Sequence, residues 1–506
     1  MSDFTRNELF DREVESFRLQ PFFPRPRRVK ILMVTDGAGS FDSTADFGLG
    51  VVIELLKLDP WWWVSFEIAT AHRGAGAPGT APSTAQYQSF RFDAPPAGAK
   101  LADFQEIWLF GVLPDGVAPA LGPDEWTALG EFMDEGGGLF ATGDHDSLGA
   151  GLCSEVPRVR RMRCWKRGGP AGTPPPQFGT DRHDTLRAGA DGRFDFDDQS
   201  DAVAQVIQPR FYRSWSPYPP GYSRHPHPLL CGRSGLTIDV LPDHMHEGEV
   251  VAPPSVAGDG EFPGGVAPEI IAWATVIGRS EGDAVDGRTF GVLGAYDGHL
   301  ASVGRIAVDS TWHHWFNVNL VGFPADSSEL EKIRNYFWNV AHWLAPASSQ
   351  QAMFENAVYG LPHIGPLREV FRPDTPIAEL GAIGLDALGR RASGCAIRSW
   401  IVERLPIELQ PWFRFPVDPD PPDPPIRGPY MGAELVLGGI VQQMLKLGCG
   451  LNPPGVAHER QVIARAVDRG VAVGLKALIQ FEHDSARYMD RFLKACQQQI
   501  ARIAIE

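Results

Sequence analysis

The sequence predicts an α/β protein in which helices cover both faces of a mostly parallel sheet, followed by an all-helical module after Pro346. Short apolar runs of strand length alternate with amphipathic stretches between residues 28 and 346, which is typical of parallel strands joined by crossover helices. Some of these runs stop at an Asp-Gly or Gly-Asp pair, where a buried strand gives way to a loop. Beyond Pro346 the apolar positions follow only the period of a helix.

The first elements follow one another in the order strand then helix. Residues 31–37 form an apolar run that predicts a buried strand, and residues 43–58 are amphipathic, with Ser43 or Thr44 available as the N-cap of a helix. Further strands are expected at 63–69, 106–112 and 139–142, with helices at 123–135 and from about Leu148.

The second part of the α/β region is interrupted. From about residue 160 to 222 the pattern gives way to Gly, Pro and Arg, which predicts a long insertion containing one short helix near 201–207. Strands are then expected at 237–241, 269–277, 289–295 and 304–309, and an amphipathic helix at 328–344 closes the unit.

These patterns divide the chain into an N-terminal arm (1–27), the α/β domain (28–346) and a helical domain (347–506). Helices are expected in the last region at 380–405, 433–447, 458–481 and 484–503, with a Pro-rich extended connector at 416–429. Small residues recur at 432–439 and 470–474, and glycine within a helix indicates close packing against a neighbour. We therefore expect these helices to support assembly into a homo-oligomer.

The amino-acid composition and net charge indicate which classes of partner the protein can bind. With 43% hydrophobic and 21% charged residues, the 506-residue chain is typical of folded proteins with two or three domains. Its net charge of -16 argues against nucleic-acid binding, because a phosphate polyanion would be repelled. One basic cluster is expected to form a solvated or salt-bridged loop: Arg158, Arg160, Arg161, Arg163, Lys166 and Arg167.

The sequence also allows a prediction of the cellular compartment in which the protein is found. It has neither an apolar run long enough to span a bilayer, about 20 residues, nor a stretch typical of a signal peptide. The six cysteines are scattered and include no CxxC pair. We therefore expect a protein of the reducing cytoplasm without a membrane partner.

Ionisable residues follow four of the predicted strands. The loop ends of parallel strands converge at one edge of a sheet, so these side chains are expected to form one polar site. Asp-Gly at Asp36 is also a common turn, and a histidine beside Trp312 is often a core residue. The four groups are Asp36 with Asp42; Asp144, His145 and Asp146; His244, His246 and Glu247; and Asp309, His313 and His314.

Two chemistries are open to this site. In the first, His145, His244, His246 and His313 bind a divalent metal such as zinc, with Asp36 or Asp144 as a further ligand, and the metal activates water. In the second, no metal is needed: Asp144 or Asp146 is the base or nucleophile and His145 or His313 shuttles protons. Here the helix expected after residue 147 offers N–H groups to an oxyanion. The candidate catalytic residues are Asp36, Asp144, His145 and His313.

Three segments carry a resemblance to a known superfamily. The strand, Asp-Gly turn and helix at 31–58, the run IWLFGV at 107–112 and the segment GGGLFATGDH at 136–145 resemble the flavodoxin-like class I glutamine amidotransferase superfamily, and within it the ThuA-like branch of trehalose-utilisation proteins. The resemblance covers residues 28–346 and implies a flavodoxin-like sheet.

The resemblance also implies a nucleophile that this sequence lacks. True glutaminases of the superfamily carry a cysteine in a GxCxG elbow, where this chain has Thr142-Gly143-Asp144-His145-Asp146. Glutamine hydrolysis through a thioester is therefore not expected. The family's HxE pair has a loose counterpart at 244–247, and Cys153, a few residues past the elbow, is expected to be a buried small apolar residue.

Two functions from different classes follow. The first is an enzyme, a hydrolase or a carbohydrate-related activity on a small molecule, using the Asp and His residues at the strand ends. The second is a ligand-binding or scaffold protein that lost its nucleophile and assembles through its helical module. The two functions predict different geometry: if the Asp and His side chains lie close together in the structure, the enzyme is favoured.

Overall fold

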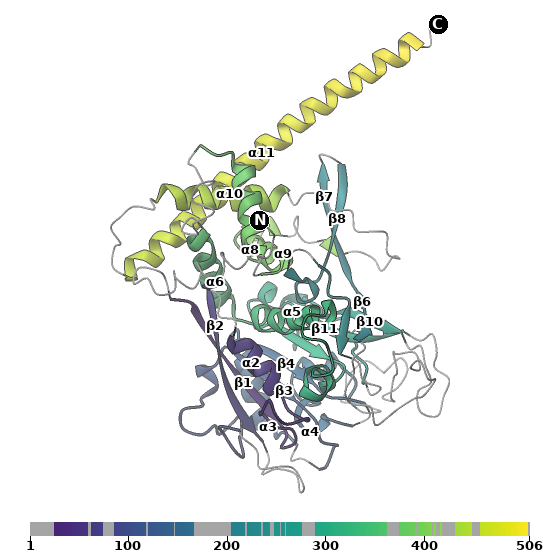
Figure 1. The fold of residues 1–506 in the computed structure, drawn as a ribbon, viewed down its shortest axis with the longest axis vertical. Helices are drawn as coiled ribbons and strands as arrows, with labels where there is room; N and C mark the ends of the chain where they lie inside the picture. Colours follow the sequence, from purple (N-terminus) through teal and green to yellow (C-terminus); the bar gives the residue numbers. More distant parts are fainter. Residues whose placement is uncertain are drawn as a thin grey trace.

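Eight strands form one sheet in the order β2-β1-β3-β4-β12-β11-β10-β6 (Figure 1). The neighbours from β2 to β12 are parallel, while β11, β10 and β6 extend the sheet in antiparallel fashion. The strands are β1 (Arg27–Thr35), β2 (Val64–His72), β3 (Glu106–Phe110), β4 (Gly138–Thr142), β6 (Gln208–Pro209), β10 (Glu269–Thr275), β11 (Thr289–Tyr296) and β12 (Ile306–Asp309). The α/β class and the mostly parallel sheet are confirmed.

The computed structural model describes part of the chain. The described residues are 25–58, 62–73, 85–117, 120–145, 147–165, 204–217, 220–233, 236–242, 247–253, 255–258, 260–275, 289–361, 374–389, 392–406, 408–410, 415–416, 431–447 and 456–503. Most of the expected N-terminal arm and of the Pro-rich connector lies outside them.

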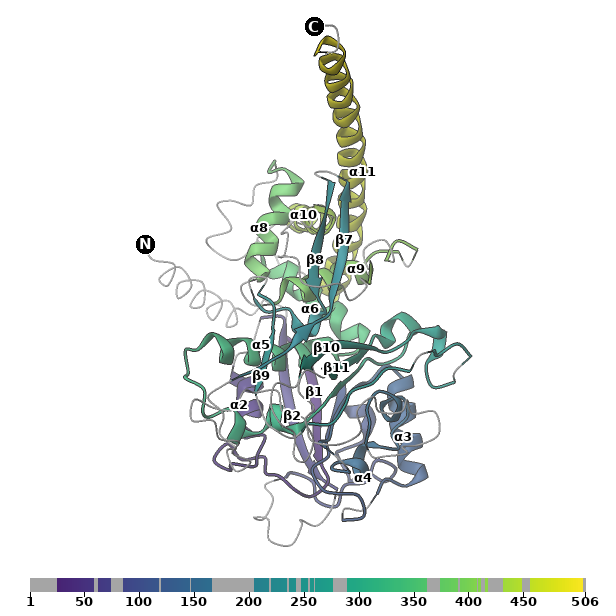
Figure 2. The same ribbon diagram turned by 90° about the vertical axis from the view of Figure 1, so that its right-hand side faces the viewer.

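Helices cover both faces of the sheet because successive strand residues point to opposite sides. In β1, Ile31 and Met33 pack on the face covered by α2 (Gly50–Leu58) and α5 (Ser328–Trp343). Leu32 and Val34 pack on the other face, with α3 (Pro123–Asp134) and α4 (Ala150–Cys153). Figure 2 shows β1 and β2 with α2 and α5 on one side and α3 and α4 on the other. These β1 side chains are fully buried, and each contributes roughly 1.5–3 kcal/mol.

The first helix is shorter than the sequence predicts. It begins at Gly50 rather than near Ser43, so the predicted N-cap at Ser43 or Thr44 is wrong. Asp42 instead accepts hydrogen bonds from the N–H and hydroxyl of Thr44, which holds a turn there. Gly50 lies so close to Ser43 that a Cβ atom at position 50 would collide with the Ser43 backbone.

The insertion contains strands where the sequence predicted a helix. Residues 204–206 form β5 (Ala204–Val206), which pairs antiparallel with β9 (Val240–Pro242), so tertiary pairing overrides the local helical pattern. A hairpin of β7 (Phe211–Pro217) and β8 (Pro220–Pro226) follows, and β13 (Phe415–Pro416) adds to its edge.

The region after Pro346 is helical apart from β13 within its described residues. Its helices are α6 (Ala347–Gly360), α8 (Ile377–Gly389), α9 (Gly394–Glu403), α10 (Met431–Lys446) and α11 (Val456–Ile503). The two helices expected at 458–481 and 484–503 are one helix of 48 residues. The expected close packing is present: a Cβ atom on Gly439 of α10 would collide with the backbone of Gly470 and Gly474 in α11. No helix among the described residues is long and apolar enough to cross a membrane.

Several contacts join the helical region to the α/β body, and two of them involve α9. The buried guanidinium of Arg305 binds Asp297 at 2.8 Å and Glu403 of α9 at 2.6 Å. A disulfide joins Cys231 to Cys395 across 164 residues of sequence, with their Cα atoms 5.8 Å apart. The scattered cysteines had suggested a reducing compartment, whereas such a bond persists in oxidising ones, so the cytoplasmic location remains a prediction.

Candidate functional site

The elbow after β4 places Asp144 at the carboxyl end of the sheet. Gly143 has no room for a side chain, because a Cβ atom there would collide with Trp165 and the carbonyl of Leu148. The Asp144 N–H donates to the Leu148 carbonyl at 3.1 Å, and the Leu148 N–H donates to the His145 carbonyl at 3.2 Å. This tight loop leaves Asp144 only 1% exposed.

Asp144 meets two of the predicted histidines. Its Oδ2 atom lies 3.3 Å from Nδ1 of His145 and 3.6 Å from Nε2 of His313. The first distance is that of a hydrogen bond, and the second is that of an ion pair too long for one. The His313 side chain is 3% exposed and that of His145 17%, so His145 lies on the solvent side of the cluster. The structure therefore brings together three of the four predicted catalytic residues.

The loop after β12 orients His313. The Thr311 hydroxyl accepts the His313 N–H at 3.0 Å, and the Trp312 N–H donates to the Gly143 carbonyl at 2.9 Å, which ties this loop to the elbow. The His313 ring stacks on Trp312 with 3.6 Å between ring centroids. Its Nδ1 atom lies 3.1 Å from the Oδ1 atom of Asn319.

These contacts determine where protons can lie. Since the amide oxygen of Asn319 is an acceptor, Nδ1 of His313 carries the proton and Nε2 faces Asp144. A proton on Nε2 would make the 3.6 Å contact with Oδ2 of Asp144 an ion pair. A carboxylate next to an imidazole is the arrangement of a general acid–base unit.

Buried polar atoms near this pair lack hydrogen-bond partners among the described residues. They are Oδ1 of Asp144, the hydroxyl of Ser310 and the indole N–H of Trp312. A buried polar group without a partner costs free energy, and it is usually explained by a water, an ion or a catalytic role. Both acceptor and donor capacity therefore remain unused next to the Asp144–His313 pair.

The Arg163 side chain holds the loops of the site together through hydrogen bonds to backbone carbonyls. It is fully buried, and its guanidinium donates to the carbonyls of Asp144 at 2.8 Å, Asp309 at 3.0 Å and Ser310 at 2.5 Å. It thereby links the ends of β4 and β12. The sequence had placed Arg163 in a solvated or salt-bridged loop, which is wrong for this residue. The expectation does hold for Arg158, which pairs with Asp134, and Arg160, which pairs with Glu261.

His314 belongs to a separate buried network. Its Nδ1 atom lies 2.6 Å from Oδ1 of Asp309, and Nε2 lies 3.0 Å from Gln205 and 3.4 Å from Glu247. Burial alone would lower the pKa of His314, but the carboxylates of Asp309 and Glu247 raise it to about 10. The imidazole is therefore a charged core residue at neutral pH.

The carboxylates of this network are held from several elements. Burial raises the pKa of Glu247 to about 7, against the opposing effect of His314. Asp309 also accepts hydrogen bonds from the Trp315 indole at 2.9 Å and the Tyr336 hydroxyl at 3.0 Å. The network holds β12 and the start of the loop that carries His313.

Asp36 does not join the cluster. Its Oδ2 atom accepts the N–H groups of Val112 and Leu113, both at 2.7 Å, so it ties the end of β1 to the loop after β3. Burial raises the pKa of Asp36 to about 6 despite these hydrogen bonds. The geometry supports the alternative interpretation of Asp36 as a turn residue, whose hydrogen bonds connect the ends of two strands.

The helix expected to follow the elbow is short. α4 has only four residues, and the N–H groups of Ala150 and Leu152 already donate to the carbonyls of Ser147 and Gly149. Cys153, inside α4, is buried as expected, and burial raises the pKa of its thiol. Asp144 therefore has no neighbouring thiolate.

The structure gives no support for a metal centre. Among the described residues, no group of three or more His, Cys, Asp or Glu side chains is arranged to hold a metal ion. His244, His246 and Asp146 lie outside these residues. A zinc site that uses His145 and His313 remains a prediction.

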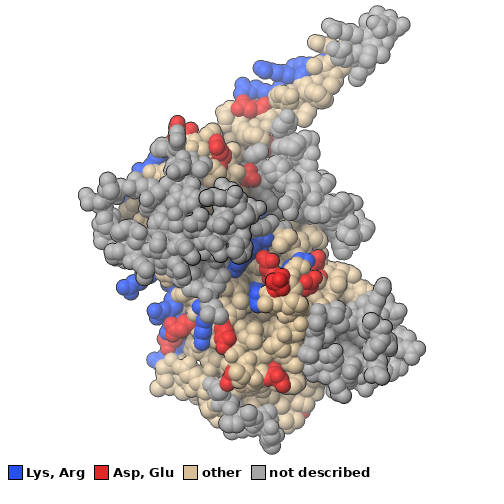
Figure 3. Space-filling view, viewed as in Figure 1, with Lys and Arg blue, Asp and Glu red and all other residues tan. Residues whose placement is uncertain are grey.

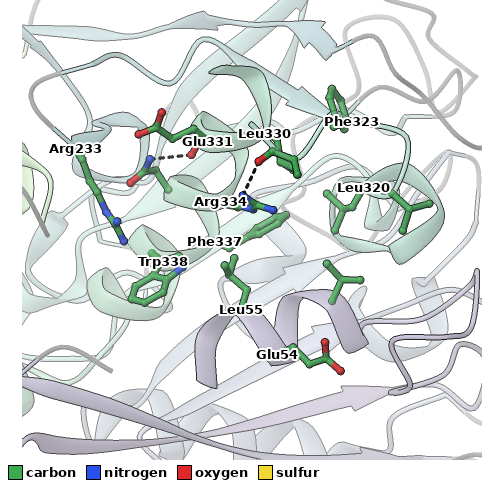
Figure 4. Close-up of a pocket in the computed structure, with 14 residues that line it drawn as sticks. Glu54, Leu55, Arg233, Leu320, Phe323, Leu330, Glu331, Arg334, Phe337 and Trp338 are labelled. Atoms are coloured by element: carbon green, nitrogen blue, oxygen red, sulfur yellow. Dashed lines mark hydrogen bonds between the residues drawn. The ribbon is translucent and has the colours of Figure 1, made fainter. Parts of the chain in front are cut away.

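A cavity lies away from the elbow. It has a volume of about 610 Å³ and lies between α2, α5 and the loop at 320–325. Figure 4 shows Leu55, Phe337 and Trp338 around this space, with Arg334 between Leu330 and Phe337 and with Glu54 and Arg233 farther out. Pockets of this volume and mostly apolar lining commonly bind small molecules.

Sequence reasoning missed the residues that support the pair. Asn319 and Gln205 belong to no motif, and Arg163 stood in a run of arginines. The sequence did give one indication for Arg163, because this residue lies next to Cys164 and Trp165. An arginine among apolar residues can be buried, with its guanidinium donating hydrogen bonds to carbonyl oxygens. Nothing in the sequence marked Asn319 or Gln205.

Comparison with known proteins adds no relative. No protein-family model matches the sequence, and the search of curated proteins found none that is similar.

Proposed function

We propose that the chain is a hydrolase that uses Asp144 and His313 as an acid–base pair, without a bound metal. One observation carries this proposal: the two oxygens of a buried carboxylate have different surroundings. Oδ2 of Asp144 faces the imidazoles of His145 and His313, while Oδ1 has no hydrogen-bond partner among the described residues. An oxygen of this kind can accept a proton from a water that attacks a substrate.

Each side chain then has a role in the reaction. Asp144 takes a proton from the attacking water at Oδ1, so its carboxylate becomes neutral. The Nε2 atom of His313 faces Oδ2 and interacts with the carboxyl group during this change. Asn319 holds the His313 tautomer at Nδ1. A protonated His145, the more exposed of the two imidazoles, gives its proton to the leaving group. The proton that Asp144 took from water then passes to His145, whose Nδ1 atom lies 3.3 Å from Oδ2, so both groups return to their starting states. Ser310 and Trp312 offer an O–H and an N–H to the polarised oxygen of the substrate.

The arrangement of strands supports a place in the superfamily that the sequence resembles. The order β2-β1-β3-β4-β12 is the 2-1-3-4-5 order of flavodoxin-like sheets, in which ligands bind at the carboxyl ends of the strands. Asp144 follows β4 at that edge, where the superfamily's glutaminases carry their cysteine. We therefore propose a flavodoxin-like domain of the class I glutamine amidotransferase type, with the ThuA-like branch as its nearest likeness, in which a carboxylate replaces the thiol.

The test is a panel of chromogenic esters, amides, phosphate esters and glycosides, assayed with the full chain in the presence and absence of a chelator. We expect turnover of one class that resists chelation and falls roughly 10²–10⁴-fold in Asp144→Asn. The matched control is Asp42→Asn, because Asp42 is exposed on a turn. Turnover that chelation abolishes would instead indicate a metal enzyme, and turnover unchanged by Asp144→Asn would exclude this site.

The α2–α5 cavity supports a second candidate, a protein that binds a small molecule without transforming it. Its floor is apolar, from Leu55, Leu330 and Trp338 among others, and both signs of charge lie at its edge through Glu331 and Arg334. This lining suits an amphipathic ligand with a polar end. In a thermal-shift screen of such compounds, a ligand should raise the melting temperature of the wild type but not of Leu55→Trp, which fills the cavity. A ligand that stabilises both equally would bind elsewhere.

A further inference from the structure

The second half of α11 leaves the body of the molecule and carries an apolar stripe with no covering element among the described residues. Figure 1 shows this helix extending past α10 to the C-terminus. Large apolar side chains on it are more than half exposed: Ile479 59%, Phe492 52% and Leu493 53%. The first half differs, because Ile463, Val467 and Gly470 are buried against the helical region.

The stripe follows the heptad period rather than the period of a single surface helix. From Leu475 onward, residues recur with alternating spacings of four and three, which assigns them to the a and d positions of a coiled coil. The nine positions are Leu475, Ile479, Glu482, Ala486, Met489, Leu493, Cys496, Ile500 and Ile503. Only Glu482 is charged, and the register continues for about four heptads, which is about 40 Å of helix.

Apart from Glu482, the charged side chains of this segment lie outside the stripe. Lys494 pairs with Asp490 at 2.6 Å and Arg487 pairs with Asp484, at positions b, e and f of the same register. Figure 3 shows Lys and Arg side chains along one edge of the extending helix and uncharged side chains beside them. The sequence thus keeps one face apolar and the opposite face solvated.

We infer that this stripe pairs with the same stripe of a second copy, so that the protein forms a homodimer through a two-stranded coiled coil of α11. A heptad repeat is complementary to another heptad repeat, which identifies the partner as a helix of the same kind. Burying each a or d side chain removes on the order of 50–100 Å² from water. Because Leu475 already packs against the core, seven apolar positions remain and bury roughly 350–700 Å² per copy, and Phe492 at a g position adds to this. The sum approaches the ~800 Å² per partner of a stable interface.

The position of Glu482 favours antiparallel pairing. In a parallel, in-register pair each Glu482 would face its copy in a buried layer, where two like charges are costly. In the antiparallel pair the layers become Met489 with Leu493, Ala486 with Cys496, and Glu482 with position 500. The two large bodies then lie at opposite ends of the coiled coil.

The state of association tests the interface. Light scattering on the full chain should give a dimer for the wild type at micromolar concentration and a monomer for Leu493→Glu, with an apparent Kd at least 100-fold weaker. The matched control is Gln498→Glu, which adds the same charge at an f position and should remain a dimer. A monomeric wild type, or a dimer unaffected by Leu493→Glu, would overturn the inference. A monomer that floats with anionic phospholipid vesicles would show that the stripe binds a membrane surface instead.

Cross-linking tests the orientation. Among the described residues, Cys153 and Cys164 are buried and Cys231 is bonded to Cys395, which leaves Cys496, on the stripe. Cys449 lies outside these residues, so every chain tested is made in a Cys449→Ser background. Under mild oxidation the wild type should stay uncross-linked, whereas Ala486→Cys should form a covalent dimer that disappears when Cys496→Ser is added. A Cys496 cross-link in the wild type would contradict the antiparallel arrangement.

Discussion

The Nε2 atom of His313 lies 3.6 Å from Oδ2 of Asp144, although the two residues come from loops after different strands. β4 and β12 are neighbours in the sheet, and their shared register places Thr142 beside Asp309 at the end from which both loops leave. The topology of the sheet, rather than the local sequence, creates the pair.

Asn319 should control the protonation of this pair. We expect Asn319→Ala to lower kcat roughly 100-fold with little change in KM, because His313 loses the acceptor that holds its tautomer. Asn319→Asp keeps an oxygen acceptor and should recover part of the rate, with a shifted pH profile. Asn335→Ala, whose side chain only binds its own helix, is the control. Equal effects of Asn319→Ala and Asn335→Ala on kcat would contradict the role.

His314 should matter for stability more than for the reaction. His314→Gln leaves the buried carboxylates of Asp309 and Glu247 without their positive partner, which should cost about 3–5 kcal/mol of unfolding free energy. Urea denaturation measures this, with the exposed His483→Gln as a control expected to stay within about 0.5 kcal/mol. A normal midpoint for His314→Gln would show that the network is not charged.

Asp36 should make stability depend on pH. Burial raises its pKa to about 6 from 3.8, so the folded carboxyl keeps a proton that the unfolded one has lost. The unfolding free energy of the wild type should therefore fall by about 3 kcal/mol, relative to Asp36→Asn, as the pH rises from 3.8 to about 6. Asn cannot titrate but keeps an oxygen for the N–H groups of Val112 and Leu113. Denaturation of both proteins at pH 4 and pH 7 gives the difference, and parallel curves would refute the assignment.

The Cys231–Cys395 disulfide should stabilise the contact between the α/β body and α9. We expect reduction, or Cys231→Ser, to lower the unfolding free energy by about 2–4 kcal/mol. The thermal transition with and without reductant measures the effect, and Cys496→Ser is the control. If intact mass under non-reducing conditions shows no bonded pair, the protein keeps these thiols reduced.

The sequence predicted the main strands and helices because a buried strand is recognisable from its own run of apolar residues. The apolar runs at β1, β3 and β4 and the helical period of α3 and α5 were sufficient to place these elements. Where a tertiary contact decided the outcome, prediction failed: β5 pairs with β9 instead of forming a helix, and α2 starts late because Gly50 packs on Ser43.

The candidate site was only partly visible in the sequence for the same reason. Residues at strand ends pointed to Asp144, His145 and His313, since parallel topology implies that such ends converge. The orienting partners Asn319 and Arg163 act through single contacts to distant segments, which no spacing reveals. The separation of His313 from its neighbour His314 into two networks depends on the short 3-10 helix at Trp312–Trp315.

A double-mutant cycle on kcat/KM, with Asp144→Asn, His313→Gln and the combination, tests the Asp144–His313 pair most directly. If the two side chains act as one unit, each single change should lower the turnover identified by the substrate panel roughly 10²–10⁴-fold, and the double variant should be no slower than the slower single variant. Multiplicative losses, or a single variant with wild-type turnover, would contradict the pair.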